Sequence, residues 1–387
     1  MAGLDLPVAA CYDAARVRIL LDYRPALRQR TGVGQYVHEL AAAMLPRLRP
    51  GESLVLFSSS WKDRLEPHTL PGARVVDVRV PVRVLNLSWH RLEWPPVERF
   101  AGPVDIAHST HPLLLPSRHR AVKVVTVYDL DFLDHPGRSR AEIRRDYPTL
   151  AARHAQRADL VVVISEHTAR EVRTRLGVAA GRIVLCRPGA PPPSDAPRSE
   201  RPGPILFVGT IEPRKNLPTL FAAYEELVTR NPGAPPLILA GGAVEQSQEI
   251  LGGLRARAAL AGRVEYRGYV SDAERQALYG SASMLVLPSF HEGFGLPAVE
   301  AMQAGVPVIA STAGALPEVV GTAGITVDPA DAAGFSAAME HLLADPAERR
   351  RRADAGRERA RLFSWTASAA TLLDAYREAF ARRAARS

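Results

Sequence analysis

Short runs of apolar residues recur along the first half of the chain, separated by polar or amphipathic segments. They lie at residues 16–22, 53–57, 73–78, 104–109, 123–129, 159–165 and 182–186. Short, continuously apolar runs are typical of strands buried on both faces of a parallel sheet. Apolar residues at helical spacing predict a helix after the first run, over residues 33–45. This alternation predicts an α/β fold with helices on both faces of a parallel sheet.

A proline-rich segment at residues 187–204 interrupts this pattern, which then resumes. Proline favours extended or turn backbone, so the segment is interpreted as a linker between two domains. Six further apolar runs follow at 204–209, 236–242, 263–269, 284–289, 306–311 and 324–329. The first of the helices between them would be capped by Asn216, and Ser364 would cap a last amphipathic helix.

The predicted division of the chain is a first domain (1–190), a linker (191–203), a second domain (204–364) and a C-terminal helix (365–387). Both domains have the pattern of a doubly wound sheet. Ligands of such sheets bind beyond the carboxyl ends of the strands. The cleft between the two domains is therefore the expected place for two substrates to meet.

Composition narrows the class of protein. The 387 residues are 47% hydrophobic and carry a formal charge of +8, which suits nucleic acid, an anionic membrane or phosphorylated substrates. No zinc-finger or RNP-type motif favours nucleic acid, and the arginine-rich stretch at 348–361 is interpreted as a solvated helix face. Cys11 and Cys186 predict neither a disulfide nor a zinc site. Without a signal peptide or a membrane-spanning run, a cytoplasmic protein is expected.

Two acids stand eight positions apart in the stretch HEGFGLPAVEAMQAGVPVIAS at residues 291–311. Glu292 is expected in a loop that contains Gly293 and Gly295, and Glu300 in the early part of the next helix. A carboxylate accepts two hydroxyl donors, such as the diol of a ribose or a hexose. Backbone amides at the start of the helix would bind an anion or a sugar hydroxyl. An alternative for Glu300 is an acid that only stabilises the helix dipole.

A second cluster is FVGTIEPRKN at residues 207–216, where Gly209 ends a strand and Arg214 and Lys215 are adjacent in the following loop. A guanidinium beside an ammonium suits a diphosphate leaving group, whose charge grows as its bond breaks. A solvated basic loop is the structural alternative.

A third cluster, TGVGQY, places Gly32 and Gly34 just before the first long helix, where the backbone can approach a phosphate. The cluster falls short of the GxGxxG fingerprint, and no acid follows at the ribose-binding distance. This argues against a nicotinamide-dependent dehydrogenase.

With these clusters in place, the chain resembles glycosyltransferase family 4, whose E-x7-E signature is matched by HEGFGLPAVE. EPRKNL, YRGYVSDAERQALY, GALPEVVGTAGITVDP and the closing FSW helix match in the same order. In the first half DYRPALRQRTGVGQYVHEL, VVTVYDLDFL and ADLVVVISEHTAREV resemble bacterial mannosyltransferase-like members. The resemblance covers nearly the whole chain from about residue 16.

The resemblance implies a GT-B fold, in which two Rossmann-like domains face each other across a cleft and the last helix crosses back to the first domain. It implies that Glu300 holds ribose hydroxyls and that Glu292 contacts the donor sugar. Arg214 and Lys215 would neutralise the diphosphate. The other residues expected to bind the donor are Gly32, Gly34, Gly209, Tyr269, Val270, Phe294, Gly295 and Leu296. The family retains anomeric configuration by a front-face reaction that needs no protein nucleophile and no metal ion.

The chain departs from the family at Tyr128, where many relatives have a histidine near the donor sugar. Asp129 keeps its place and is carried over as a catalytic residue. With Asp131 it forms a DxD triplet, which we interpret as coincidental because the strand it follows should end away from the donor diphosphate. His108 and His111 either face the cleft or are buried and hydrogen-bonded.

The sequence therefore predicts a hexosyltransferase, with mannose from GDP-mannose as the preferred donor and a glycan or lipid-linked acceptor. The alternatives are a UDP-sugar-dependent transferase, a GT-B nucleotide-sugar 2-epimerase and a non-catalytic nucleotide-binding module. No separate cofactor is expected. The basic surface suggests peripheral contact with an anionic membrane. Replacing Glu292 or Lys215 by alanine is expected to abolish transfer with little change in melting temperature.

Overall fold

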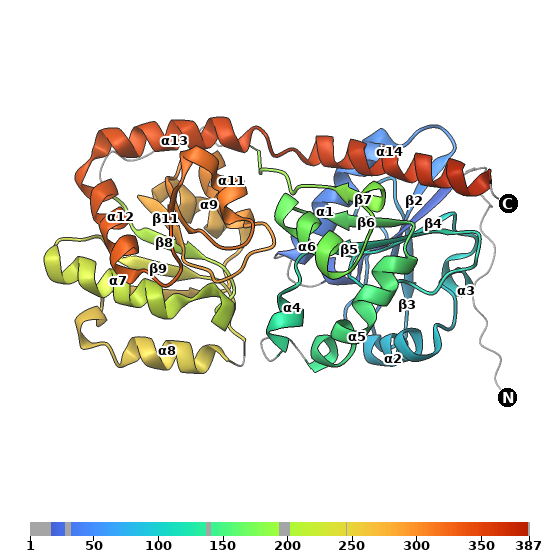
Figure 1. The fold of residues 1–387 in the computed structure, drawn as a ribbon, viewed down its shortest axis with the longest axis horizontal. Helices are drawn as coiled ribbons and strands as arrows, with labels where there is room; N and C mark the ends of the chain where they lie inside the picture. The colour runs from blue at the N-terminus through green and yellow to red at the C-terminus, as the bar shows by residue number, and fades with distance from the viewer. Residues whose placement is uncertain (1–16, 28–31, 137–140, 193–201, 245, 386–387) are drawn as a thin grey trace.

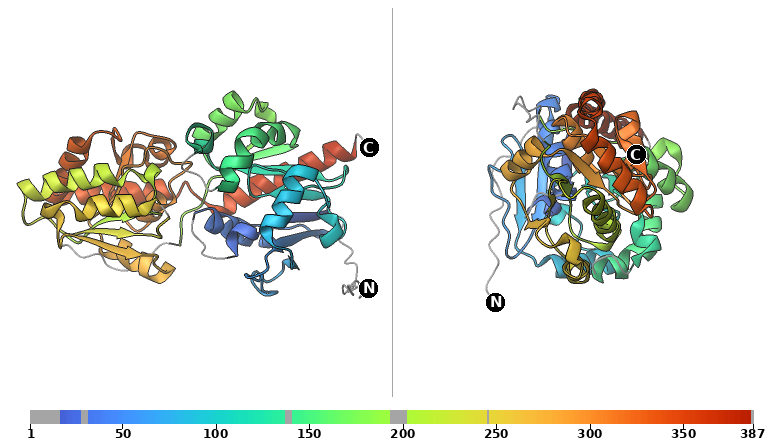
Figure 2. Two further views of the ribbon diagram at one scale, coloured as in Figure 1. Left: turned by 90° about the horizontal axis from the view of Figure 1, so that it is seen from below. Right: turned by 90° about the vertical axis from the view of Figure 1, so that its left-hand side faces the viewer.

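The computed structural model describes residues 17–27, 32–136, 141–192, 202–244 and 246–385. Two α/β domains lie next to each other along the longest axis of the molecule, as Figures 1 and 2 show. Cys11 and most of the predicted linker lie outside the described residues. Cys186 is a buried free thiol.

The first domain is built on a seven-stranded sheet in the order β3-β2-β1-β4-β5-β6-β7, with every neighbouring pair parallel. Its strands are β1 (Val17–Asp22), β2 (Glu52–Ser59), β3 (Arg74–Val78), β4 (Ile106–Ser109), β5 (Val122–Val127), β6 (Leu160–Val163) and β7 (Ile183–Leu185). Its helices are α1 (Val33–Met44), α2 (Val82–Leu92), α3 (Glu98–Ala101), α4 (Asp131–Asp134), α5 (Ala141–Arg157) and α6 (Glu166–Arg175).

The second domain has a six-stranded parallel sheet in the order β10-β9-β8-β11-β12-β13. Its strands are β8 (Ile205–Val208), β9 (Leu237–Ala240), β10 (Val264–Gly268), β11 (Met284–Leu287), β12 (Val308–Ser311) and β13 (Ile325–Val327). Its helices are α7 (Leu217–Arg230), α8 (Ser247–Arg255), α9 (Asp272–Ser281), α10 (Leu296–Gln303), α11 (Leu316–Val320), α12 (Ala332–Ala344) and α13 (Pro346–Ala360).

Every apolar run that predicted a strand forms one, so the α/β prediction is confirmed. The inner strands are mainly apolar because helices cover both sheet faces; β4, β6, β8 and β11 are buried at every position. The edge strands β3 and β10 are more exposed and carry charged residues. The strand order reverses between β1 and β4 in the first sheet and between β8 and β11 in the second. Such reversals open a crevice at the carboxyl ends of the strands, where ligands bind.

The last helix, α14 (Trp365–Ala384), lies along the first domain, whereas α13 packs on the second (Figure 1). The Ser364 hydroxyl caps α14 by accepting the N–H of Ala367 at 3.3 Å. Arg377 binds Glu52 of β2 at 2.8 Å. The chain changes domain between α13 and α14, where the N–H of Ala190 donates to the carbonyl of Phe363 at 3.0 Å. Two chain segments therefore connect the domains side by side.

The arginine-rich stretch is only partly the solvated face that the sequence suggested. Arg351 and Arg361 are exposed. Arg352, in contrast, donates to the carbonyl of Gly324 at 2.8 Å, and Arg359 donates to that of Val319 at 3.1 Å. These arginines satisfy carbonyl groups at the end of α11 and in the turn after it, so they hold α13 against the second domain.

Candidate active site

Two neighbouring strand ends form the site, because the reversal between β8 and β11 places the loops after them side by side. Gly209 follows β8, and a short 3-10 turn, Pro213–Lys215, carries the two cations. The loop after β11 carries Glu292 and leads into α10. Gly295 at its N-cap has φ +102°, a backbone conformation that favours glycine.

Glu292 lies at the centre of a buried charge cluster. Its Oε1 accepts hydrogen bonds from Lys215 Nζ at 2.5 Å and from the Ser289 hydroxyl at 2.8 Å. Its Oε2 accepts one from Arg214 Nη1 at 3.1 Å. Burial acts to raise the pKa of Glu292, but Lys215 and Arg214 lower it to about 2. The carboxylate is therefore charged, and the sequence-predicted residues Glu292, Arg214 and Lys215 form one cluster.

The Arg214 side chain is held on several sides. Its Nε lies 2.8 Å from Glu212 Oε1, and Nη1 also donates to the carbonyl of His291 at 3.0 Å. Burial disfavours its charged form, but the neighbouring carboxylates, chiefly that of Glu292, raise the pKa of the Arg214 guanidinium. The Arg214 side chain is 24% exposed, whereas the Lys215 side chain is 8% exposed. Arg214 thus presents a fixed positive charge at the surface of the loop.

Glu300 is buried in α10, and its contacts rule out the helix-dipole alternative. It is the fifth residue of the helix, beyond the first turn. Its Oε2 accepts the Tyr279 hydroxyl at 2.9 Å and lies 3.2 Å from Arg275 Nε. Its Oε1 accepts from Gln35 Nε2 at 3.2 Å, a contact with the other domain. Burial raises the pKa of Glu300, with Arg275 acting in the opposite direction.

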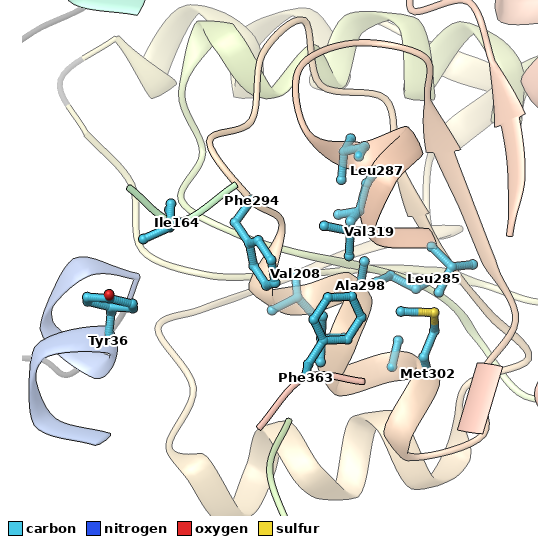
Figure 3. Close-up of a cluster of buried hydrophobic side chains, with 14 of the residues drawn as sticks. Tyr36, Ile164, Val208, Leu285, Leu287, Phe294, Ala298, Met302, Val319 and Phe363 are labelled. Atoms are coloured by element: carbon cyan, nitrogen blue, oxygen red, sulfur yellow. The ribbon is translucent and has the colours of Figure 1, made fainter. Parts of the chain in front are cut away.

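The remaining residues predicted to bind the donor lie on, or directly next to, elements that contact these acids. Gly34 is buried in the first turn of α1, next to Gln35, with Gly32 at the N-cap. Tyr269 is exposed and Val270 buried, just before α9, which carries Arg275 and Tyr279 to Glu300. Phe294 directs its ring into the core, 5.4 Å from that of Phe363 (Figure 3). Leu296 begins α10. The backbone of 294–296 thus lies at the helix start.

Asp129 requires a correction. The sequence placed it away from the donor diphosphate, yet its charge helps to raise the pKa of Arg214. A Cβ atom on Gly293 would come within 2.2 Å of the Tyr128 carbonyl and 3.3 Å of Asp129 Cβ. The loop after β5 of the first domain therefore packs on the loop between β11 and α10 of the second (residues 288–295), called the donor loop below because the sequence predicts donor binding there. The Tyr128 hydroxyl is buried and has no hydrogen-bond partner.

The two acids of the DxD triplet do not face a common ligand. Asp129 accepts the N–H of Asp131 at 3.3 Å, and the Asp131 carboxylate binds His135 at 3.0 Å.

The two histidines near the end of β4 lie in the first domain. His108 is fully buried and bonds to Thr126 at 2.7 Å and to Tyr376 of α14. His111 lies 3.4 Å from Asp22 of β1. Both histidines belong to the interior network of the first domain.

Asn216 requires a correction of the predicted helix cap. It stands at the N-cap position of α7, but its Oδ1 accepts the Thr219 hydroxyl at 2.8 Å and makes no capping bond to a backbone N–H. Its amide donates to the carbonyls of Pro288 at 2.9 Å and Pro329 at 2.7 Å.

Two residues that contact the acids had not been singled out from the sequence. Ser289 donates to Glu292, and Gln35 donates to Glu300. In the sequence, their position next to the motif residues was the signal that could have identified them.

Two family models match the chain. "Glycosyltransferase Family 4" matches residues 30–192, and "Glycosyl transferases group 1" matches residues 203–345. The matched ranges coincide with the two α/β domains. None of the described helices is both long and apolar enough to cross a membrane.

Curated and solved proteins agree with these models. O-antigen chain mannosyltransferase B of Escherichia coli is 34% identical over 232 residues, which span 57% of this chain and 61% of that protein. Glycogen synthase of Mycobacterium tuberculosis is 30% identical over 315 residues, 77% of this chain and 72% of that protein. The structure of sucrose-phosphate synthase from Thermosynechococcus elongatus has a TM-score of 0.77 at 24% identity, and the alignment covers 95% of this chain and 100% of that one. This last similarity concerns the fold.

Proposed function

The chain belongs to glycosyltransferase family 4, and from this premise we propose that it transfers mannose from GDP-mannose to a hydroxyl of a glycan or lipid-linked acceptor. The reaction proposed retains anomeric configuration and uses no metal ion. The observation that carries the proposal is the buried cluster of Glu292 with Lys215 and Arg214 at the ends of β8 and β11.

The cationic couple is suited to the leaving group. As the bond between the sugar C1 and the phosphate oxygen breaks, negative charge accumulates on the diphosphate. Lys215 and Arg214 stabilise that charge, and because Glu292 and Glu212 already fix their positions, little reorganisation is needed. Glu292 also offers its carboxylate to the sugar hydroxyls, and Glu300 does the same for the ribose.

The proposed step needs no protein nucleophile. The bond from C1 to the leaving oxygen breaks while a bond from C1 to the acceptor oxygen forms on the same face. The acceptor proton passes to the leaving phosphate oxygen. Asp129, near Arg214, helps to fix the guanidinium on the side facing the first domain.

The choice of mannose rests on relatives that are named mannosyltransferases. The test incubates the purified chain with GDP-mannose, UDP-glucose and UDP-N-acetylglucosamine in turn and measures nucleotide release and thermal shift. GDP-mannose is expected to give the largest response. A larger response to a UDP-sugar would overturn the donor assignment and leave the transferase assignment standing.

A matched pair of lysine variants tests the site. Lys215→Ala is expected to lower kcat at least about 100-fold, the usual effect of removing one group that stabilises transition-state charge. Lys62→Ala removes an exposed lysine of the first domain and is expected to leave turnover unchanged. Full turnover by Lys215→Ala would contradict the proposal. A sugar epimer formed without any acceptor would indicate an epimerase instead.

Membrane contact is the remaining part of the proposal. It is supported only by the net charge of +8. Co-sedimentation with vesicles of anionic and of neutral lipid tests it. Equal recovery with both vesicle types would remove it.

A further inference from the structure

Three buried polar atoms that have no hydrogen-bond partner among the described residues lie where the two domains meet. They are Nε2 of His167, Oε2 of Glu171 and Nε2 of His291. His167 and Glu171 lie one turn apart on α6 of the first domain, and His291 comes from the donor loop of the second. One possible ligand atom of each residue lies within 4.8 Å of those of the other two. Among the described residues, no other trio of His, Cys, Asp and Glu side chains meets that condition.

Such convergence needs an explanation, because buried polar atoms are nearly always satisfied. The two atoms on α6 are 3.4 Å apart but are not aligned as a hydrogen bond. The rings of His167 and His291 meet edge to face, with centroids 5.6 Å apart. One small species bound between the three would satisfy all of them at once.

We propose that these residues form a binding site for a late first-row divalent cation such as Zn²⁺, and that the bound ion bridges the two domains. Two imidazoles and one carboxylate are a ligand set that zinc commonly uses. In a tetrahedral site with bonds of about 2 Å, ligand atoms lie roughly 3.3 Å apart. The α6 pair already has that spacing, and a side-chain adjustment of up to about 1.5 Å at His291 completes the set.

The surroundings permit a cation. Arg175 donates to the other oxygen of Glu171 at 3.1 Å, which leaves Oε2 to act as a single ligand. The charge of Arg175 is balanced by Asp134, which it contacts at 2.6 and 2.8 Å. With neutral imidazoles, the three ligands carry one negative charge. A cation is therefore attracted to the site.

The site also borders a pocket. This pocket, of about 240 Å³, lies between α4 and the donor loop and has His291 and Phe290 on its wall. Asp131 and Asp134 line the same pocket and give its wall an acidic character. The His291 Nε2 atom itself is buried, so an ion enters from this side only as the His291 ring moves, which is the same adjustment that completes the ligand set.

An ion held here would act on the donor site without taking part in the chemistry. The His291 carbonyl accepts a hydrogen bond from Arg214, and Glu292 is the next residue. Because the ligands come from both domains, occupancy fixes the donor loop against α6. The proposed ion is therefore a structural link across the cleft, separate from the metal-free transfer step.

The test titrates the metal-free chain with Zn²⁺ by calorimetry and records the absorption of the Co²⁺ form. One equivalent is expected to bind, with a tetrahedral Co²⁺ spectrum. His291→Ala and His167→Ala are each expected to weaken binding at least ten-fold, because each removes a ligand. The melting temperatures of the metal-free variants, measured alongside, check that they are folded.

His135→Ala is the matched control, since His135 lines the same pocket but lies outside the trio. It is expected to bind Zn²⁺ as the unaltered chain does. Three outcomes would overturn the proposal: no stoichiometric binding, equal binding by His291→Ala, or a high-resolution map with an ordered water alone between the three atoms. If His167→Ala weakens binding and His291→Ala does not, the bridge between the domains is refuted.

Discussion

Replacing Glu292 by alanine tests whether the donor site is held together by its own charges. The change would leave Lys215, 8% exposed, without its carboxylate partner, while Arg214 would retain Glu212. Removing one partner of a buried ion pair costs about 3–5 kcal/mol of stability. Because Arg214 keeps Glu212 as a partner, we expect a loss at the lower end of this range. For a domain of this size that loss lowers the melting temperature by roughly 6–12 °C. The structure thus reverses the expectation from sequence, under which the variant melts like the unaltered chain.

Calorimetric melting of the two forms measures the loss directly. The double variant Glu292→Gln/Lys215→Met removes both charges. It is expected to lose less stability than the sum of the losses in Glu292→Gln alone and Lys215→Met alone. Additive losses would mean that the two side chains are not coupled. Each kcal/mol of lost stability lowers the melting temperature of a domain of this size by roughly 2–4 °C. A melting temperature for Glu292→Ala within about 1–2 °C of that of the unaltered chain would therefore refute the buried-pair argument.

A nucleoside diphosphate extends the same experiment to function. Ligands that bind only the folded chain stabilise it in proportion to the logarithm of their concentration over Kd. In the Glu292→Ala variant the phosphates would supply the counter-charge that Lys215 has lost. GDP is therefore expected to raise the melting temperature of the variant more than that of the unaltered chain. An equal or smaller rise would show that the phosphates do not reach this cation.

Three further predictions concern the frame around the site. Burial lowers the pKa of His108 from 6.5 to about 3, so its contribution to stability is present above pH 6.5 and is lost as pH falls towards 3. His108→Gln is therefore expected to reduce the loss of unfolding free energy between pH 7 and 4 by about 3 kcal/mol, and an unchanged profile in urea titrations would contradict this. Ser364→Ala removes the cap of α14 and should cost about 1 kcal/mol in the same assay, whereas no loss would mean that the cap is not formed in solution. The Glu318 carboxylate accepts the N–H groups of Glu166 and His167 across the cleft, both at 2.9 Å; Glu318→Ala is expected to speed hydrogen exchange at these amides, and unchanged protection would argue against the contact.

The sequence predicted the fold because the relevant signal is local. Each strand of a parallel sheet covered on both faces is apolar along its length, as at 284–287, and can be recognised from its own residues. The apolar stripe of α7 is equally local: Leu217, Leu220 and Tyr224 recur at helical spacing in the sequence, and all three are buried. The motif loops could also be located, since glycines and charged residues follow directly after such runs.

Contacts between the domains could not be predicted, because they join residues far apart in the chain. Gln35 and Glu300 are 265 positions apart, and nothing in the neighbourhood of either indicates the other. The same holds for Glu318 with α6. Asn216 shows a subtler limit. Its type and place indicate a helix cap, but its Oδ1 accepts the Thr219 hydroxyl at 2.8 Å instead of a backbone N–H. Its amide donates to two carbonyls from distant loops.

These long-range contacts meet two segments of the second domain, residues 293–300 and helix α11. Tyr128 packs on Gly293, Gln35 donates to Glu300, and α6 is capped by Glu318 of the helix that follows β12. Since Gly293 and Glu300 flank the start of α10, the first domain positions the amides and acids to which the donor is proposed to bind. The geometry of the donor site thus depends on how the two domains meet. Any change that alters the seam, by mutation or by a bound ion, should therefore alter donor affinity even without touching a donor-binding side chain.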